Sequence, residues 1–495
     1  MAGFHYLDVL IIFGYFLFLI FIGVWSSRKI KSTGDFFIGG RRFGKFMMIL
    51  LTFGTGTHTD QAIGVVSKCY QIGLAGIWYQ FLWLINTPFY WIMAPVVRRL
   101  RVVNTADYYR KRYNQNVAML YAVLAIVICM LNMGMILLGS GRIIEAISNH
   151  YISFPVAVLG VTALFLSYGL TGGLIAAVIT DVLQGVLTIV LSFILLPFAL
   201  LRVGGFSGLH EKLSGAPHNM FSLTTPGEIT IFFIIMVSLN SLLNWPNQPY
   251  SIMASTACKT EMESRVGVTY GNFIKRFCTV AWAFTGLCCL ALFPNLTNPD
   301  HAFGVAARTL LPIGRVGLLS ASVLAAAQST CDAIMVSAAS IFTRNIYKVY
   351  FEREKSDRHY LMVGRFVSFF VVAGSLAFAF LLPGIVAALE LFWKIPALMG
   401  VSFWIGIIWR RANPATVWTS FIASFVVFIA CEMDLFIGYE VPLPWQMISY
   451  IIAGLLGAVI ASLATKPQSK EHLDRFYDEF KKPVDKLEHL ASDNL

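Results

Sequence analysis

The segment "LLTFGTGTHTDQAIGVV", residues 50–66, places a run of polar residues in the middle of an apolar stretch. Gly54 and Gly56 within it permit backbone conformations that unwind a helix. An unwound segment in a membrane helix frees carbonyl groups that bind cations and helix ends that bind solutes. The segment therefore predicts a discontinuous membrane helix; the alternative is a kinked helix whose polar face meets other helices.

A second interrupted stretch, "LNSLLNWPNQPYS" at residues 239–251, follows about five predicted spans later. Its asparagine, serine and proline residues disfavour a continuous helix, because proline lacks the amide hydrogen that a helix needs. Two broken helices at this separation are typical of transporters that are built from inverted repeats. The pair therefore indicates a transporter.

The composition places both stretches in a membrane protein. The chain has 495 residues, of which 57% are hydrophobic and 13% are charged, and its mean hydropathy is +0.71. An ordinary soluble domain does not have this composition. Apolar stretches of about 20 residues, the length that crosses a bilayer, predict about thirteen transmembrane helices. They cover residues 6–27, 44–70, 76–97, 117–147, 152–170, 174–203, 228–247, 267–294, 313–345, 360–382, 384–409, 412–432 and 444–464.

The net charge of +11 follows the positive-inside rule and does not indicate nucleic-acid binding. Basic residues gather at 28–45, 98–112, 344–358 and 410–411, whereas the alternate loops are sparse or acidic. This asymmetry predicts an integral protein of the plasma membrane with its N-terminus outside and its C-terminus in the cytoplasm. We expect the lipid bilayer, and no nucleic acid, as its partner.

The ninth predicted span contains "AAAQSTCDAIMVSAASIFTRNIY", residues 325–347. Ser329 and Thr330 are adjacent hydroxyls, and Asp332 shares a helix face with Ser329. Hard oxygen ligands suit a cation such as Na⁺, although hydroxyls of this kind also pack helix against helix. A buried carboxylate at 332 needs a cation, a proton or a basic partner.

Two further features concern ionisable residues inside spans. Asp181 in "TGGLIAAVITDVLQG", residues 171–185, has no basic residue near it in sequence, which favours a cation or proton role over a local cap. The preceding "GLTGG" at 169–173 predicts a tight turn between two spans. Glu390 and Lys394 lie one helical turn apart, which predicts a mutual ion pair.

"GDFFIGGRRFGKF" (34–46), together with the segments around Asp181 and Ser329, resembles the sodium:solute symporter family. The resemblance implies an all-α membrane protein with the five-plus-five inverted-repeat fold of the leucine-transporter type. It divides the chain into an extra N-terminal helix with a basic loop (1–43), a first repeat (44–203), a second repeat (204–411), C-terminal helices (412–465) and a charged cytoplasmic tail (466–495).

The same resemblance implies a sodium site. Its ligands would be backbone carbonyls of Gly54, Thr57 and Ala326 and the hydroxyls of Ser329 and Thr330. These hydroxyls are the ones that the ligand chemistry of the ninth span already favours.

The resemblance also implies a second site, for a cation or a proton, at Asp181, Ser329 and Asp332. Residues after the first break, with the next helices, would bind the solute. These candidate solute-binding residues are Gly56, His58, Thr59, Asp60, Gln61, Gln80, Asn132 and Asn240.

Together these features predict a sodium-coupled symporter that imports a small polar organic solute by alternating access and works as a monomer. Na⁺ is the expected co-transported ion, because an ion and a solute that bind better together can drive one another across the membrane. A proton-coupled symporter of the same fold is the alternative, and a transporter-like membrane sensor is a third possibility. We do not expect an enzyme, because no span carries a His/Glu metal pattern or a nucleophile elbow.

Overall fold

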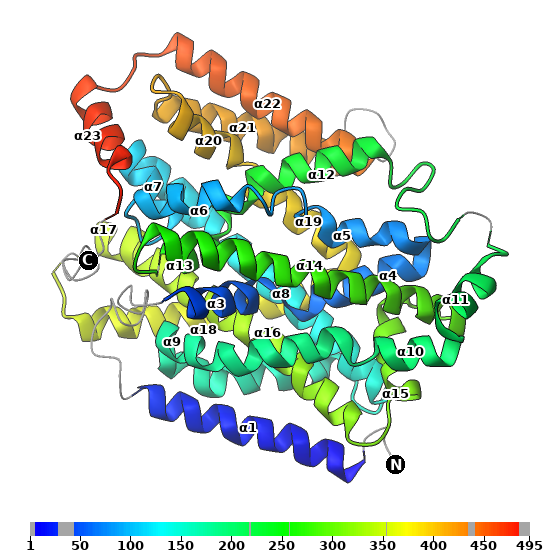
Figure 1. The fold of residues 1–495 in the computed structure, drawn as a ribbon. Helices are drawn as coiled ribbons and strands as arrows, with labels where there is room; N and C mark the ends of the chain where they lie inside the picture. The colour runs from blue at the N-terminus through cyan, green and yellow to red at the C-terminus, as the bar shows by residue number, and fades with distance from the viewer. Residues whose placement is uncertain are drawn as a thin grey trace.

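The computed structural model describes residues 5–27, 44–216, 219–256, 258–352, 354–433 and 441–484, without the side chains of 19, 20, 22–27, 167–182, 253, 254 and 256. Helices make up the regular structure of these ranges (Figure 1). Eight of the described helices are long and apolar enough to cross a membrane, and four shorter ones are apolar. The prediction of an all-helical membrane protein is confirmed.

Helices follow one another along the chain with short connections. The first half contains α1 (Tyr6–Ser27), α3 (Lys45–Gly56), α4 (Thr59–Ile72), η2 (Gly73–Ile77), α5 (Trp78–Phe81), α6 (Tyr90–Arg99), α7 (Thr105–Arg112), α8 (Gln115–Ile147), α9 (Phe154–Phe193), α10 (Leu196–Val203) and α11 (Gly205–Leu213). The second half contains α12 (Ile231–Asn244), η3 (Trp245–Asn247), α13 (Pro249–Thr256), α14 (Glu261–Leu292), η4 (Pro299–His301), α15 (Ala302–Leu310), α16 (Arg315–Ile341), η5 (Phe342–Tyr347), α17 (Lys348–Tyr350), α18 (Asp357–Leu381), α19 (Ile385–Ala397), α20 (Gly400–Ile408), α21 (Pro414–Glu432), α22 (Leu443–Ala464) and α23 (Lys470–Lys481).

The first predicted break lies between α3 and α4. Helix α3 ends at Gly56, and α4 begins at Thr59. Between them Thr57 (φ −128°, ψ 110°) and His58 (φ −139°, ψ 171°) have extended backbones. Extended residues interrupt the helical hydrogen bonds, so carbonyl groups at the end of α3 become available to other partners. The prediction of a discontinuous helix is confirmed.

The second predicted break lies between α12 and α13. Helix α12 ends at Asn244, a short turn follows, and Gln248 (φ −81°, ψ 110°) is extended before α13 begins at Pro249. Pro246 and Pro249 supply no amide hydrogen at this point, which explains why the helix does not continue. This prediction is also confirmed.

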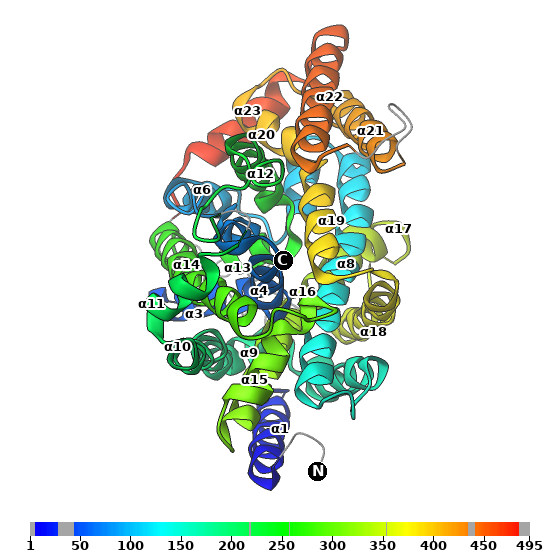
Figure 2. The same ribbon diagram turned by 90° about the vertical axis from the view of Figure 1, so that its right-hand side faces the viewer.

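Helix α14 packs along both halves of the first broken helix (Figure 2). Glycines allow the close approach: a Cβ atom at Gly271 would lie 2.9 Å from the carbonyl oxygen of Ile49 in α3, and one at Gly286 would lie 2.7 Å from Cβ of Cys69 in α4. Small residues at such contacts let membrane helices pack backbone to backbone. Helix α14 therefore holds α3 and α4 in place and brings its own side chains to the break.

Helix α16, which carries the predicted hydroxyl ligands, lies against α1, α8 and α9. Helix α9 is assigned from Phe154 to Phe193. This helix passes through residues 169–173 without interruption, so the tight turn predicted there was wrong. The side chain of Asp181 lies among residues 167–182, whose side chains are outside the described part of the chain.

The predicted ion pair between Glu390 and Lys394 was wrong. Lys394 binds the carboxylate of Glu432 and lies 3.0 Å from Oε1 of Gln446. Glu390 accepts a hydrogen bond of 2.5 Å from the hydroxyl of Tyr79. The two residues are one turn apart on α19, but each binds a different residue from another part of the chain. These tertiary contacts replace the local ion pair that the sequence spacing predicts.

The C-terminal tail begins with α23, an amphipathic helix. Leu473, Phe476 and Tyr477 are buried, and the ring centroid of Phe476 lies 6.2 Å from that of Tyr108 in α7. The sequence predicts a solvated charged face as the default for this tail. The structure shows a solvated face on one side of α23 and an apolar face packed on α7.

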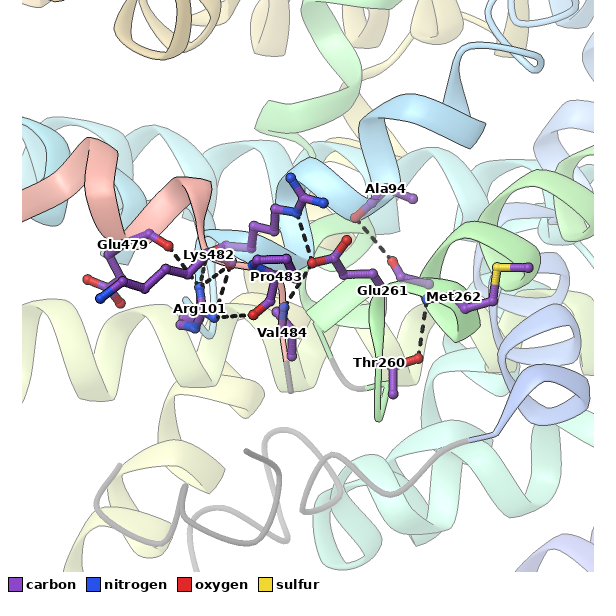
Figure 3. Close-up of polar contacts among 11 residues, drawn as sticks. Ala94, Arg101, Thr260, Glu261, Met262, Glu479, Lys482, Pro483 and Val484 are labelled. Carbon is purple, nitrogen blue, oxygen red and sulfur yellow. Dashed lines mark hydrogen bonds and ion pairs between the residues drawn. The ribbon is translucent and has the colours of Figure 1, made fainter. Parts of the chain in front are cut away.

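The chain after α23 is also attached to the body (Figure 3). Arg101 donates hydrogen bonds to the carbonyl oxygens of Glu479 (3.1 Å), Lys482 (3.2 Å) and Pro483 (3.1 Å). The amide of Val484 donates to Oε1 of Glu261, at the start of α14, at 2.9 Å. The tail thus joins α6 and α7 to α14 at one end of the bundle.

Candidate functional site

A cavity lies between the two broken helices. Gly56, His58 and Gln61 line it from the first break, and Gln248 and Tyr250 line it from the second. Both breaks were predicted from sequence, the second as the companion of the first, and the structure brings them to one cavity. Sites between discontinuous helices are where transporters of this construction bind their cargo.

Aromatic side chains form much of the cavity wall. The lining includes Trp83, Tyr90, Trp245, Phe392 and Trp393. Polar side chains such as His58, Gln61, Gln80, Gln248 and Asn272 line the cavity together with these rings, and aromatic surfaces with convergent polar groups are typical of a small-molecule site. Flat rings of this kind fit the apolar faces of a compact ring-shaped solute while polar groups bind its edges.

Two of the predicted sodium ligands, Gly54 and Thr330, are in contact next to the first break. The hydroxyl of Thr330 in α16 lies 3.3 Å from the carbonyl oxygen of Gly54 and donates to it. Ala326 and Ser329 are fully buried beside it on the same helix. Thr57 is fully buried, and its hydroxyl has no hydrogen-bond partner in the described ranges. These hydroxyl and carbonyl oxygens are hard ligands of the kind that Na⁺ prefers.

The predicted second cation or proton site is only partly described. Asp332 is 3% exposed and lies on α16 with Ser329. The third member, Asp181, has a side chain outside the described part of the chain. This second site therefore stays a prediction.

The polar run after the first break divides into two groups. His58 and Gln61 line the cavity. Asp60 does not line it: this residue is fully buried, and its Oδ1 accepts from Nδ1 of His58. Thr59 is also turned away, with its hydroxyl 2.9 Å from that of Ser140 in α8. The structure thus places only half of the run at the cavity.

Three predicted solute-binding residues lie farther along the chain. Gln80 lines the cavity, and its Oε1 is buried without a hydrogen-bond partner among the described residues. Asn132 is fully buried in α8 but does not line the cavity. Asn240 is also outside the lining: it donates to the carbonyl of Trp393 (2.8 Å) and accepts from the hydroxyl of Tyr450 (2.5 Å). These contacts make Asn240 a link between α12, α19 and α22.

Lys275 is a lining residue that the sequence predictions missed. Its Nζ donates to the carbonyl oxygen of Gly56, at the end of α3. Among the described residues that line the cavity, it is the one Lys, Arg, Asp or Glu. The neighbouring Arg276 donates to the carbonyl oxygen of Gln80 at 2.7 Å. The signal was present in the sequence, because two adjacent cations inside a predicted span are costly and usually functional.

Gly139 of α8 provides a test of how tightly this region is packed. A Cβ atom there would lie 2.9 Å from Cα and 3.1 Å from the amide nitrogen of Asp60. We expect Gly139→Ala to destabilise the protein by about 1–3 kcal/mol through overpacking and to weaken solute uptake, because α4 must shift. Thermal unfolding of the purified protein and uptake into proteoliposomes measure the two effects.

The matched control for this prediction is Gly160→Ala in α9, where the added Cβ atom meets nothing within 4 Å. A Gly139→Ala protein as stable and as active as the Gly160→Ala protein would contradict the packing that the structure shows.

Comparisons with known proteins agree with this arrangement. The model of the sodium:solute symporter family matches residues 36–425. The sodium/glucose cotransporter of Vibrio parahaemolyticus is 24% identical to the chain, over 94% of the chain and 91% of that relative. The sodium/myo-inositol cotransporter 2 of Mus musculus is 25% identical, over 82% of the chain and 67% of that relative.

Solved structures show the same fold. A substrate-bound, outward-open Na⁺-coupled sialic acid symporter superposes with a TM-score of 0.81 at 19% identity, over 94% of the chain and 99% of that protein. Mhp1, a nucleobase-cation-symport-1 family transporter, superposes with a TM-score of 0.57 at 14% identity, over 91% of the chain and 99% of that protein. The predicted leucine-transporter-type fold is thereby confirmed.

Proposed function

The chain belongs to the sodium:solute symporter family, and from this premise we propose that it imports a small polyhydroxylated solute together with Na⁺ by alternating access. Members of this family are transporters, so the chain is an integral membrane transporter and not an enzyme. Orientation with the N-terminus outside, the repeats at 44–203 and 204–411, and action as a monomer belong to the same proposal.

One observation carries the sodium part of the proposal. The Thr330 hydroxyl meets the Gly54 carbonyl, and Gly56, two residues later, lines the cavity. Ion and solute would therefore both bind at the last turn of α3, next to the break. When each ligand stabilises one arrangement of a shared segment, each increases the affinity of the protein for the other. This coupling is what a symporter requires.

The polar groups of the cavity support a solute with several hydroxyls. Oε1 of Gln61 and Oε1 of Gln80 are buried acceptors without a donor among the described residues, and both residues line the cavity. An unmatched buried acceptor is costly, so a solute that brings donors binds favourably. Lys275 supplies a donor for a solute oxygen. A hydroxyl both donates and accepts, so a polyol or sugar satisfies all three groups.

The relatives support the same class of solute. Two of them carry the names of glucose and myo-inositol cotransporters, and both solutes are compact rings with hydroxyls at their edges. The aromatic cavity wall suits such rings, because their apolar faces can pack against Trp and Phe side chains.

A thermal-shift screen of the purified protein tests the proposal. The panel contains hexoses, inositols, amino acids, quaternary amines and carboxylates, each in NaCl and in KCl of equal concentration. A bound solute stabilises the folded protein by mass action, by about 2.7 kcal/mol at one hundred times its dissociation constant. We expect a polyol to raise the unfolding temperature, and to raise it more in NaCl. Stabilisation by amino acids or amines alone, or an equal effect in both salts, would refute this assignment.

A further inference from the structure

We infer that Asp60 is a positioning residue for solute binding: through His58, it fixes which atom of the Gln61 amide faces the cavity. Asp60 itself does not line the cavity. The inference rests on the proposed transport function. It adds a relay of three residues, Asp60, His58 and Gln61, which decides whether Gln61 accepts a hydrogen bond from the solute or donates one to it.

The first step is the contact between Asp60 and His58. Oδ1 of Asp60 pairs with Nδ1 of His58, and both side chains are buried, with exposed fractions of 0% and 2%. A carboxylate only accepts hydrogen bonds, so Nδ1 carries the hydrogen. Oδ2 of Asp60 meets no hydrogen-bond partner in the described ranges. Among the described residues, the contact with His58 is therefore the hydrogen bond that Asp60 makes with its side chain.

The second step is the contact between His58 and Gln61. Nε2 of Gln61 lies 2.9 Å from Nε2 of His58. An amide nitrogen only donates, so the histidine nitrogen accepts, which is the role that remains to Nε2 once Nδ1 carries the hydrogen. The two contacts thus agree on one histidine tautomer.

The third step is the orientation of the Gln61 amide. Because its nitrogen is held by His58, its Oε1 is left as a buried acceptor without a partner among the described residues. Gln61 lines the cavity, so this oxygen is available to a hydroxyl of the solute. Without the acceptor at Asp60, the hydrogen of His58 can move to Nε2. Gln61 would then turn, and its amide nitrogen would face the solute.

Exchange of the carboxylate between positions 60 and 61 tests the relay. Asp60→Ala releases the histidine hydrogen, and Gln61→Glu alone places a carboxylate against the acceptor nitrogen of His58. We expect each single variant to raise the apparent KM for the solute by about tenfold or more, with little change in the sodium concentration for half-maximal uptake. In Asp60→Ala/Gln61→Glu, the Nε2 hydrogen of His58 meets a carboxylate whose second oxygen faces the cavity.

The double variant is therefore expected to recover an apparent KM within about threefold of wild type, since the interaction is shared and the effects are not additive. Thr59→Ala/Gln61→Glu is the matched control. Because Thr59 contacts Ser140 in α8 and not His58, this double variant should keep the raised apparent KM of Gln61→Glu. If Asp60→Ala does not fold, the double variant must still transport with a lower apparent KM than Gln61→Glu.

The results separate the relay from the function on which it rests. A wild-type protein that transports a polyol with sodium, while the double variant is as poor as the Gln61→Glu variant, overturns the relay alone. A wild-type protein that takes up no polyol overturns the proposed solute class. Recovery in the double variant but not in the Thr59 control supports the relay.

Discussion

Replacing Ser329 and Thr330 together by alanine is expected to abolish sodium-dependent uptake. Both residues are fully buried on α16, and the Thr330 hydroxyl meets the Gly54 carbonyl at 3.3 Å. A polar contact with a charged partner contributes about 1.5–3 kcal/mol. The loss of two such ligands therefore lowers sodium affinity by about 100-fold or more. Initial rates of solute uptake, measured against sodium concentration, give the half-saturation value directly.

The matched control is Ser337→Ala/Ser340→Ala. These two serines lie farther along α16, and their hydroxyls are also buried, without a hydrogen-bond partner in the part of the chain that the structure describes. The control also removes two hydroxyls from the same helix, but away from the Gly54 carbonyl, so its sodium dependence should stay close to wild type. Unchanged sodium dependence in the Ser329/Thr330 variant would remove the site assignment.

Lys275→Ala is expected to have the second largest effect. Lys275 donates to the Gly56 carbonyl and is the one Lys, Arg, Asp or Glu among the described residues that line the cavity. Its removal leaves a helix-end carbonyl without its donor and takes away a hydrogen-bond donor for the solute, each a loss of about 1–3 kcal/mol. We expect the apparent KM for the solute to rise by about 10- to 100-fold, with a smaller change in sodium affinity.

Lys212→Ala is the control for the loss of a lysine side chain, because Lys212 is exposed on α11 and lies outside the cavity. Uptake by both variants should be measured at equal amounts of protein in the liposome membrane. A Lys275→Ala protein with the solute affinity of the Lys212→Ala protein would show that Lys275 does not contribute to the solute site.

The helix breaks were predictable because their causes are local. Gly54 and Gly56 weaken one helix, and Pro246 and Pro249 interrupt the other, whatever packs around them. The shared helix of Ser329 and Thr330 was predictable for a related reason: the two residues are adjacent within one predicted span, and both lie on α16.

The distribution of side chains around the cavity was not predictable from local spacing. Asn240 is near the second break in sequence, but its amide is taken by Trp393 and Tyr450 from helices far along the chain. Glu390 and Lys394 likewise bind other helices in preference to each other. These partners are decided by which helices pack together, and no residue near them in sequence carries that information.

Asp60 depends both on local sequence, which predicts its position, and on tertiary packing, which decides its contacts. Its position in an intramembrane polar run marked it as functional. Its backbone packs closely against Gly139 of α8, whereas His58 and Gln61 on either side of it line the cavity. Sequence therefore identified the run, and tertiary packing decided which of its members face the cavity.

Concentrative uptake by the purified protein in liposomes tests most directly whether the protein imports its solute with the sodium gradient. Liposomes are loaded with potassium buffer and diluted into sodium or potassium buffer of equal pH, with the polyol that stabilises the protein most as the labelled solute. We predict accumulation above the external concentration only with the inward sodium gradient, and its loss when a sodium ionophore is added. Accumulation driven by an inward proton gradient without sodium, or no accumulation under the sodium gradient, would contradict the account.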